Sequence, residues 1–164
     1  MASWVSWGSL VSTDPQLSAS IRELLHQYGR GMAYLATVRK DGAPRVHPVS
    51  PIVTDDALYC FVIASRKRDD LLRDGRFALH TFPAETSDAE AHLTGRAREV
   101  LNVSIVDQLA RDHSAAPGVD WTLFELLLDS AMLHRHTPGA PARIWRANPG
   151  CPTRATPEPV LVAA

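Results

Sequence analysis

The pattern of apolar and polar residues along the chain predicts short strands with a few helices between them. Residues 18–28 place apolar side chains at helical spacing, and Ser18 or Ser20 is a candidate cap. Residues 121–128 fit a short helix or the beginning of a strand equally well. Elsewhere we expect strands at 32–38, 44–53, 58–64, 77–82, 91–101, 132–136 and 143–147, and helices at 69–74 and 103–113.

The second of these strands, residues 44–53, has a distinctive pattern. It follows Lys40-Asp41-Gly42, a hairpin turn in which Asp-Gly accepts the positive φ that tight turns require. Two-residue alternation puts Arg45, His47 and Val49 on one face, and Val46, Pro48 and Ser50 on the other. Pro48 and Pro51 have no N–H to donate, so the strand is expected at a sheet edge or with an irregularity.

Several short antiparallel strands with hairpin turns and covering helices indicate a mainly β fold, a small closed or half-closed antiparallel barrel. The length of 164 residues fits one domain. We expect this domain over residues 17–148, after an N-terminal arm over 1–16 and before a proline-rich, disordered tail over 149–164. In the arm, Trp4 and Trp7 lie in a loosely packed segment or cover an apolar groove.

Composition and charge exclude several classes of protein. The formal net charge is −1, whereas a nucleic-acid-binding domain is usually clearly basic. No apolar run approaches the roughly 20 residues of a membrane span, and no signal-peptide pattern begins the chain, so we expect a cytoplasmic protein. Cys60 and Cys151 suggest neither a disulfide framework nor a metal knuckle.

Metal-dependent and hydrolytic chemistry find little support in the sequence. His134 and His136 share a strand face, and His80 and His92 lie on neighbouring strands, but no spacing supplies a third ligand. We therefore expect no metal site. The chain also has no Ser-His-Asp order, nucleophile elbow, P-loop or glycine-rich dinucleotide motif.

The most informative stretch for chemistry is Ser65-Arg66-Lys67, which stands between a buried strand and a short helix. A helix N-terminus presents unpaired N–H groups and the positive end of the helix dipole, so it favours an anion. Arg and Lys add charge-assisted hydrogen bonds. The stretch predicts a phosphate site.

These residues resemble a known family, the FMN-binding split barrels of the pyridoxamine 5′-phosphate oxidase superfamily. The resemblance covers residues 20–148, and its specific part is 32–82: a hairpin with a glycine turn, a strand opening with Arg, a buried strand, then Ser-Arg-Lys before a short helix. In that family the Arg and the Lys both reach the flavin phosphate. Here they are Arg45 and Lys67, 22 residues apart as the family spacing requires.

The resemblance implies a set of cofactor-binding residues. Arg45 and Lys67 would hold the phosphate of FMN, with Ser65 and Arg66 beside it. The remaining members would contact the rest of the cofactor: Val46, His47, Pro48, Val49 and Ser50 through backbone groups, Cys60 and Phe61 from the next strand, and Trp145 from the last strand. His47 could bond the flavin ring or transfer a proton, or simply bond the backbone.

What the resemblance implies about function stays broad. Vitamin-oxidising members usually end the second-strand motif with Lys, where this chain has Ser50, so the cofactor is better supported than vitamin oxidation. We expect a homodimeric, flavin-dependent oxidoreductase for a small organic substrate, with the cofactor at the subunit interface and no catalytic residue assigned. The alternatives are a deazaflavin-dependent reductase, whose coenzyme usually requires a more basic groove, a non-enzymatic flavin or haem carrier, and a barrel that binds nothing.

Overall fold

The computed structural model describes residues 4–113, 115 and 117–147. Within these residues it has four helices and eight strands. The helices are α1 (Trp7–Thr13), α2 (Pro15–His26), α3 (Arg66–Arg73) and α4 (Val103–Asp112). The strands are β1 (Ala33–Val38), β2 (Pro44–Val49), β3 (Pro51–Val53), β4 (Leu58–Ile63), β5 (Arg76–Thr81), β6 (Ala89–Glu99), β7 (Trp121–Arg135) and β8 (Arg143–Arg146).

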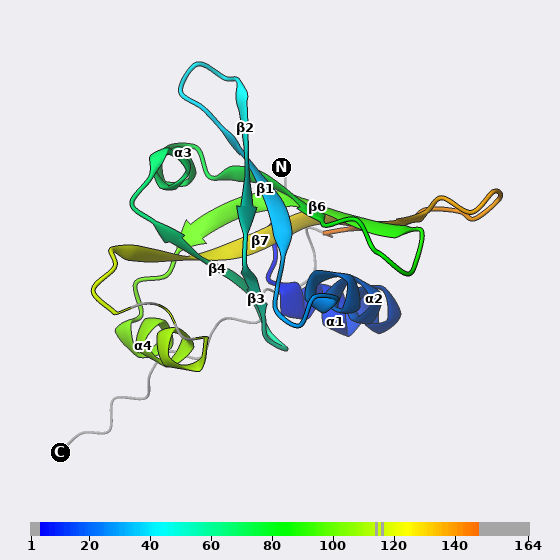
Figure 1. Ribbon diagram of the computed structural model, residues 1–164, viewed down its shortest axis with the longest axis horizontal. Coiled ribbons are helices and arrows are strands. Elements are labelled where there is room, and N and C mark those ends of the chain that lie inside the picture. The colour runs from blue at the N-terminus through cyan, green and yellow to red at the C-terminus, as the bar shows by residue number, and fades with distance from the viewer. Residues whose placement is uncertain (1–3, 114, 116, 148–164) are drawn as a thin grey trace.

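The strands form one antiparallel sheet that curls on itself. Its order is β2-β1-β5-β6-β7-β4-β3, and β8 pairs with β7. β2 and β3 stand at opposite ends of this order, yet only Ser50 separates them in the chain. The sheet therefore has to bend until its two edges approach each other, which produces the half-barrel seen in Figure 1. The predicted split barrel is confirmed, and both prolines of this segment lie on edge strands, as expected.

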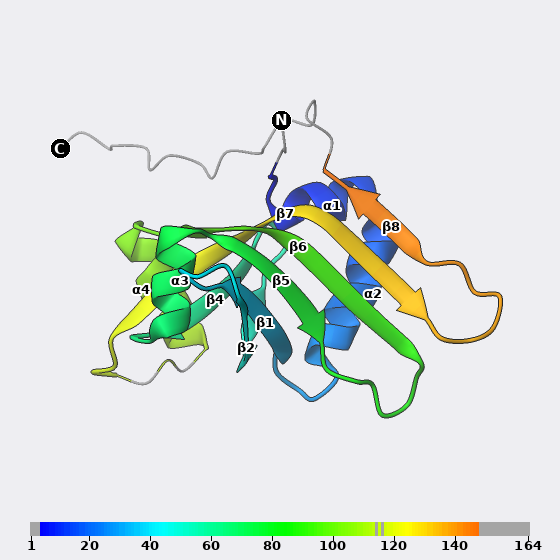
Figure 2. The same cartoon turned by 90° about the horizontal axis from the view of Figure 1, so that it is seen from above.

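The interior of the half-barrel holds the main apolar core. Inward-facing residues of the strands meet fully buried side chains of α1 and α2, such as Leu10, Ile21 and Leu25. A smaller apolar cluster lies where Leu109 of α4 packs near Tyr59 and Leu123. Figures 1 and 2 show α1 and α2 towards one end of the curled sheet and α3 towards the other, and buried residues of all three helices belong to the main core.

The N-terminal segment is packed more closely than its sequence indicates. Trp7 of α1 is fully buried in the main core, so the expected loose packing is wrong for this helix. α2 begins at Pro15, and its cap is Asp14, whose carboxylate accepts a hydrogen bond from the Leu17 N–H, instead of Ser18 or Ser20. The division of the chain at residues 16 and 148 stays a prediction.

The last long strand differs from the prediction. β7 runs without a break through residues 121–135, so the separate strand expected at 132–136 is wrong and residues 121–128 are strand. The register of β6 and β7 shifts between Thr94 and Gly95. A Cβ at Gly95 would lie 1.8 Å from the Leu127 carbonyl oxygen, so the close approach of the two strands requires glycine there.

Two further predictions concern the ends of the chain and membranes. The tail at 149–164 and Cys151 lie outside the described residues. No helix within the described ranges is long and apolar enough to cross a membrane.

Candidate functional site

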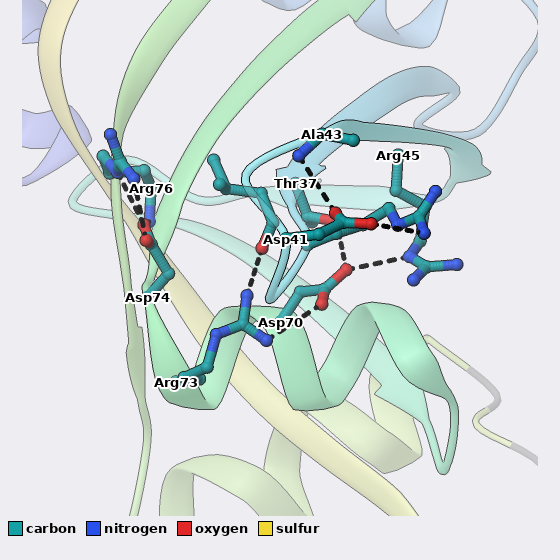
Figure 3. A network of polar contacts seen from close by, with 10 residues as sticks. Thr37, Asp41, Ala43, Arg45, Asp70, Arg73, Asp74 and Arg76 are labelled. Carbon is teal, nitrogen blue, oxygen red and sulfur yellow. Dashed lines mark hydrogen bonds and ion pairs between the residues drawn. The ribbon is translucent and has the colours of Figure 1, made fainter.

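The β1–β2 hairpin and α3 together form the candidate site (Figure 3). The hairpin turns at Asp41-Gly42, where Gly42 has a φ of 84° and the Arg39 N–H donates to the Ala43 carbonyl oxygen at 2.9 Å. As predicted from the alternation along β2, Arg45, His47 and Val49 face inward and are half-buried. This face of β2 contacts α3 through the ion pair between Arg45 and Asp70.

Asp70 is the most buried charge of the site, with 5% of its side chain exposed. Its Oδ2 accepts hydrogen bonds from Arg45 Nε at 2.8 Å and Thr37 Oγ1 at 3.0 Å, and its Oδ1 accepts one from Arg73 Nη1 at 3.2 Å. Burial alone would raise the pKa of the Asp70 carboxyl, but the bonds from Arg45, Thr37 and Arg73 outweigh burial and lower it. Asp70 is therefore ionised at neutral pH.

The positive charges of Lys67 and Arg45 both act on His47, which also lies near this carboxylate. Burial lowers the pKa of His47, and the nearby positive charges of Lys67 and Arg45 lower it further, so His47 is neutral at pH 7. The Nε2 atom of His47 is buried and has no hydrogen-bond partner among the described residues. Lys67 likewise makes no hydrogen bond or ion pair within the described ranges. The three residues form a positively charged corner with unused hydrogen-bonding capacity.

The start of α3 opens onto the same corner. Ser65 occupies the N-cap position, but its hydroxyl donates to the Ile63 carbonyl oxygen at 2.8 Å and does not cap the helix. The first backbone bond of the helix runs from the Asp69 N–H to the Ser65 carbonyl. The N–H groups of residues 66–68 consequently find no partner in the described part of the chain, and they carry the positive end of the helix dipole.

A hollow of about 400 Å³ lies between the hairpin and α3. Its lining holds five cationic side chains and three carboxylates: Arg39, Lys40, Arg45, Arg66 and Arg73, with Asp41, Asp69 and Asp70. Arg45 belongs both to this hollow and to the corner with His47 and Lys67. Arg66, a predicted phosphate neighbour, is exposed and faces the hollow.

The remaining predicted residues of this segment lie along an edge of the sheet, in β2 or, for Ser50, directly after it. Val46, Pro48 and Ser50 are exposed, Val46 to 61%, while Val49 packs against the main core. Because β2 pairs only with β1 in the described sheet, the backbone groups on its outer edge are open to a ligand.

Cys60 and Phe61 face opposite sides of β4, so their side chains do not meet the same surroundings. Cys60 is fully buried in the main core, where burial raises the pKa of its thiol to about 12 despite the opposing charge of Lys67. Phe61 is half-buried against the smaller cluster and lies edge to face with Trp121, with ring centroids 6.3 Å apart. The charge of Lys67 therefore reaches the Cys60 side of β4.

Trp145 is not brought to the corner within one chain. It lies in β8 opposite Ala131 of β7, and its Nε1 donates to Thr13 Oγ1 of α1 at 2.9 Å. Figure 2 shows β8 next to α1, on the side of the sheet away from α3.

Asp70 and its partners Thr37 and Arg73 were not predicted from the sequence as members of the site. One signal was present. Asp70 follows Lys67 by three residues, which places both on one face of a helix.

Comparison with known structures supports the fold. A protein related to general stress protein 26, of the pyridoxinephosphate oxidase family, from Clostridium acetobutylicum superimposes with a TM-score of 0.61 at 14% identity, covering 79% of this chain and 93% of that one. The heme storage protein HutZ from Vibrio cholerae gives 0.56 at 17% identity, with 73% and 94% covered.

A heme binding protein from Mycobacterium smegmatis gives a TM-score of 0.60 at 16% identity, and the match spans 78% of this chain and 57% of that protein. No curated protein sequence matches. These identities establish similarity of fold alone. The stronger finding is a sequence profile of the family Pyridoxamine 5′-phosphate oxidase, which matches residues 17–125, the part that contains α3 and the strands around it. The chain therefore belongs to the pyridoxamine 5′-phosphate oxidase family.

Proposed function

We propose that this protein binds FMN, with the cofactor phosphate at the corner formed by Arg45, Lys67 and the start of α3, and acts as a flavin-dependent oxidoreductase on a small organic substrate. One observation carries the proposal: β2 and α3 bring two cations and an unpartnered, buried imidazole nitrogen together beside an uncapped helix N-terminus. A buried polar atom without a partner is costly, so a bound polar group is expected there.

The phosphate fits the charges of the corner. Asp70 accepts a hydrogen bond from the Nε of Arg45 alone. The two terminal nitrogens of the guanidinium have no partner in the described part of the chain and can bind an anion. The ammonium of Lys67 has no carboxylate partner there that an anion would have to displace. The open N–H groups of residues 66–68 add hydrogen-bond donors.

The rest of the flavin would lie along β2. From Arg45 to Val49 this edge strand leaves the backbone groups on its outer side unpaired within the described sheet, and Val46 and Pro48 expose apolar surface beside them. A neutral His47 can donate to or accept from a polar atom of the cofactor through Nε2. Residues Val46 to Ser50 therefore stay our candidates for contacts with the flavin ring.

FMN, when bound, supplies the hydride or electron transfer, while the protein orients it and shapes the pocket. We assign no acid or base to the chain. We further propose a homodimer with the flavin at the interface, because β2 leaves one side open and Tyr34 and Val46 expose apolar surface near it. In such a dimer the partner would cover the flavin, since Trp145 of the same chain lies elsewhere.

The hollow between the hairpin and α3 favours a second candidate, a deazaflavin-dependent reductase. Its five cationic side chains outnumber its three carboxylates, and such coenzymes usually need a basic groove. A haem carrier is a third candidate, motivated by the heme proteins among the structural neighbours. A Soret band would identify haem, and binding of the deazaflavin coenzyme in preference to FMN would identify the reductase.

The test is a fluorescence titration of the protein with FMN, comparing Lys67→Ala with Lys40→Ala. Both variants remove one lysine, but Lys40 lies in the hairpin turn and outside the corner. Loss of a charge-assisted hydrogen bond at Lys67 should weaken FMN binding by about tenfold or more, and Lys40→Ala should change it by less than about threefold. Equal affinities for FMN in the two variants would refute the phosphate assignment.

A further inference from the structure

Arg45, which the proposed function requires for binding the FMN phosphate, already forms an ion pair with a buried carboxylate, that of Asp70. Asp70 lies between Arg45 of β2 and Arg73 of α3 (Figure 3). A carboxylate so close to a phosphate ligand should weaken phosphate binding through its charge. Its position therefore needs a physical reason.

The geometry of the contact supplies one. Asp70 engages Arg45 through Nε alone, at 2.8 Å, so the guanidinium is held along one side and its two terminal nitrogens stay free. A planar guanidinium that is fixed in this way can present its fork to a phosphate with little further loss of side-chain freedom. With 22% of its side chain exposed, Arg45 would otherwise sample several rotamers.

Asp70 is itself held in place by two further bonds. Thr37 Oγ1 donates to the same oxygen that accepts from Arg45, at 3.0 Å, and Arg73 donates to the other oxygen at 3.2 Å. Arg73 also donates to the Val38 carbonyl oxygen, which ties the end of α3 to β1. The carboxylate is thus fixed by the sheet and by the helix before any ligand binds.

We propose that Asp70 is a positioning residue that holds the guanidinium fork of Arg45 in place for the phosphate of the cofactor. Its negative charge at the same time reduces the electrostatic attraction of the corner for the phosphate. This inference rests on the proposed function. Positioning and simple electrostatics predict opposite changes in FMN affinity when the Asp70 carboxylate is removed. If charge alone mattered, Asp70→Asn would tighten FMN binding, whereas loss of positioning weakens it.

The experiment measures the dissociation constants of FMN and riboflavin, which lacks the phosphate, for the wild-type protein and for two variants. Asp70→Asn removes the positioning carboxylate. Asp69→Asn is the matched control, since Asp69 neighbours it on α3 and lines the same hollow, but makes no bond to Arg45. Asp70→Asn should weaken FMN binding by about fivefold to fiftyfold and leave riboflavin binding unchanged, while Asp69→Asn should leave FMN binding equal or tighter.

A double variant separates positioning from a general structural role. If Asp70 acts through Arg45, adding Asp70→Asn to Arg45→Ala should weaken FMN binding no further. The inference would be overturned if the losses of FMN affinity in the double variant were additive. It would also be overturned if Asp70→Asn weakened riboflavin binding in parallel, or if it left FMN binding unchanged or tighter. A wild-type protein that binds neither FMN nor riboflavin would instead overturn the proposed function, and the inference with it.

Asp70→Asn leaves a buried amide between two arginines, so circular dichroism must first establish that the variant folds. If it does not, Thr37→Val serves in its place, because it removes one neutral donor to the Asp70 oxygen that accepts from Arg45 and preserves the net charge. Thr37→Val should weaken FMN binding by about threefold and leave riboflavin binding unchanged. Unchanged FMN binding in Thr37→Val would then overturn the inference.

Discussion

Gly31 allows the segment before β1 to approach the start of β3 closely, where the two edges of the half-barrel come together. It lies buried before β1, against the point where the chain leaves Ser50 and enters β3. A Cβ at this position would lie 1.9 Å from the Pro51 carbonyl oxygen and 3.0 Å from its carbonyl carbon. Ordinary contact begins at 3.4 Å, so Gly31→Ala would push the two segments apart by about 1.5 Å.

The cost of this displacement follows from the atoms involved. Pro51 meets the new methyl group with backbone, so no rotamer change relieves the clash and β3 or the segment before β1 must move. Overpacking by one methyl group costs about 1–3 kcal/mol, and we expect the upper end, about 3 kcal/mol, because the obstacle is backbone. Gly29→Ala is the matched control, with a φ of 85° and no atom within 4 Å, and should cost only about 1–2 kcal/mol.

Urea unfolding at 25 °C and at a fixed protein concentration measures both variants, with the free energy of unfolding taken from the midpoint and slope. The prediction is a loss for Gly31→Ala at least 1 kcal/mol larger than the loss for Gly29→Ala. Equal losses, or a Gly31→Ala variant as stable as the wild type, would show that the strand change at Ser50 does not depend on this close approach.

Two further predictions concern stability. Trp7→Ala should lower the free energy of unfolding by about 3–5 kcal/mol, because Trp7 is fully buried. Trp4→Ala should lower it by far less, since Trp4 is 38% exposed. Similar losses for the two variants in urea unfolding would contradict the packing of α1. Acid should destabilise the protein through Asp74, whose pKa the hydrogen bonds from Arg76 lower to about 2. A lowered native pKa stabilises the fold above the unfolded value of about 4, and this stabilisation is lost as the pH falls towards 2. Asp74→Asn should reduce the loss of stability between pH 5 and pH 2.5, and an unchanged pH dependence would refute the assignment.

Local patterns predicted the elements around the site well. The Asp41-Gly42 turn, the alternation of Arg45 and His47, and the helix after Ser65 each depend on neighbouring residues, and the structure has all of them. The split barrel itself followed from the resemblance and is confirmed by the strand order.

Features that depend on distant contacts were not predicted. Trp7 is buried because α1 packs on the core through side chains that carry no clear period in the sequence. Asp70 became part of the site because α3 lies against Thr37 and Arg45, which are 33 and 25 residues away in the chain. The separation of Trp145 from the corner likewise follows from the pairing of β8 with β7.

We propose above that the corner of Arg45, His47 and Lys67 holds the phosphate of a flavin. The most direct test is calorimetric titration of the purified wild-type protein with FMN and with riboflavin, after an absorbance spectrum has shown whether a chromophore co-purifies. We expect saturable FMN binding that is at least about tenfold tighter than riboflavin binding, since the phosphate makes charge-assisted hydrogen bonds. Equal affinity for the two flavins, or no binding of either, would contradict it.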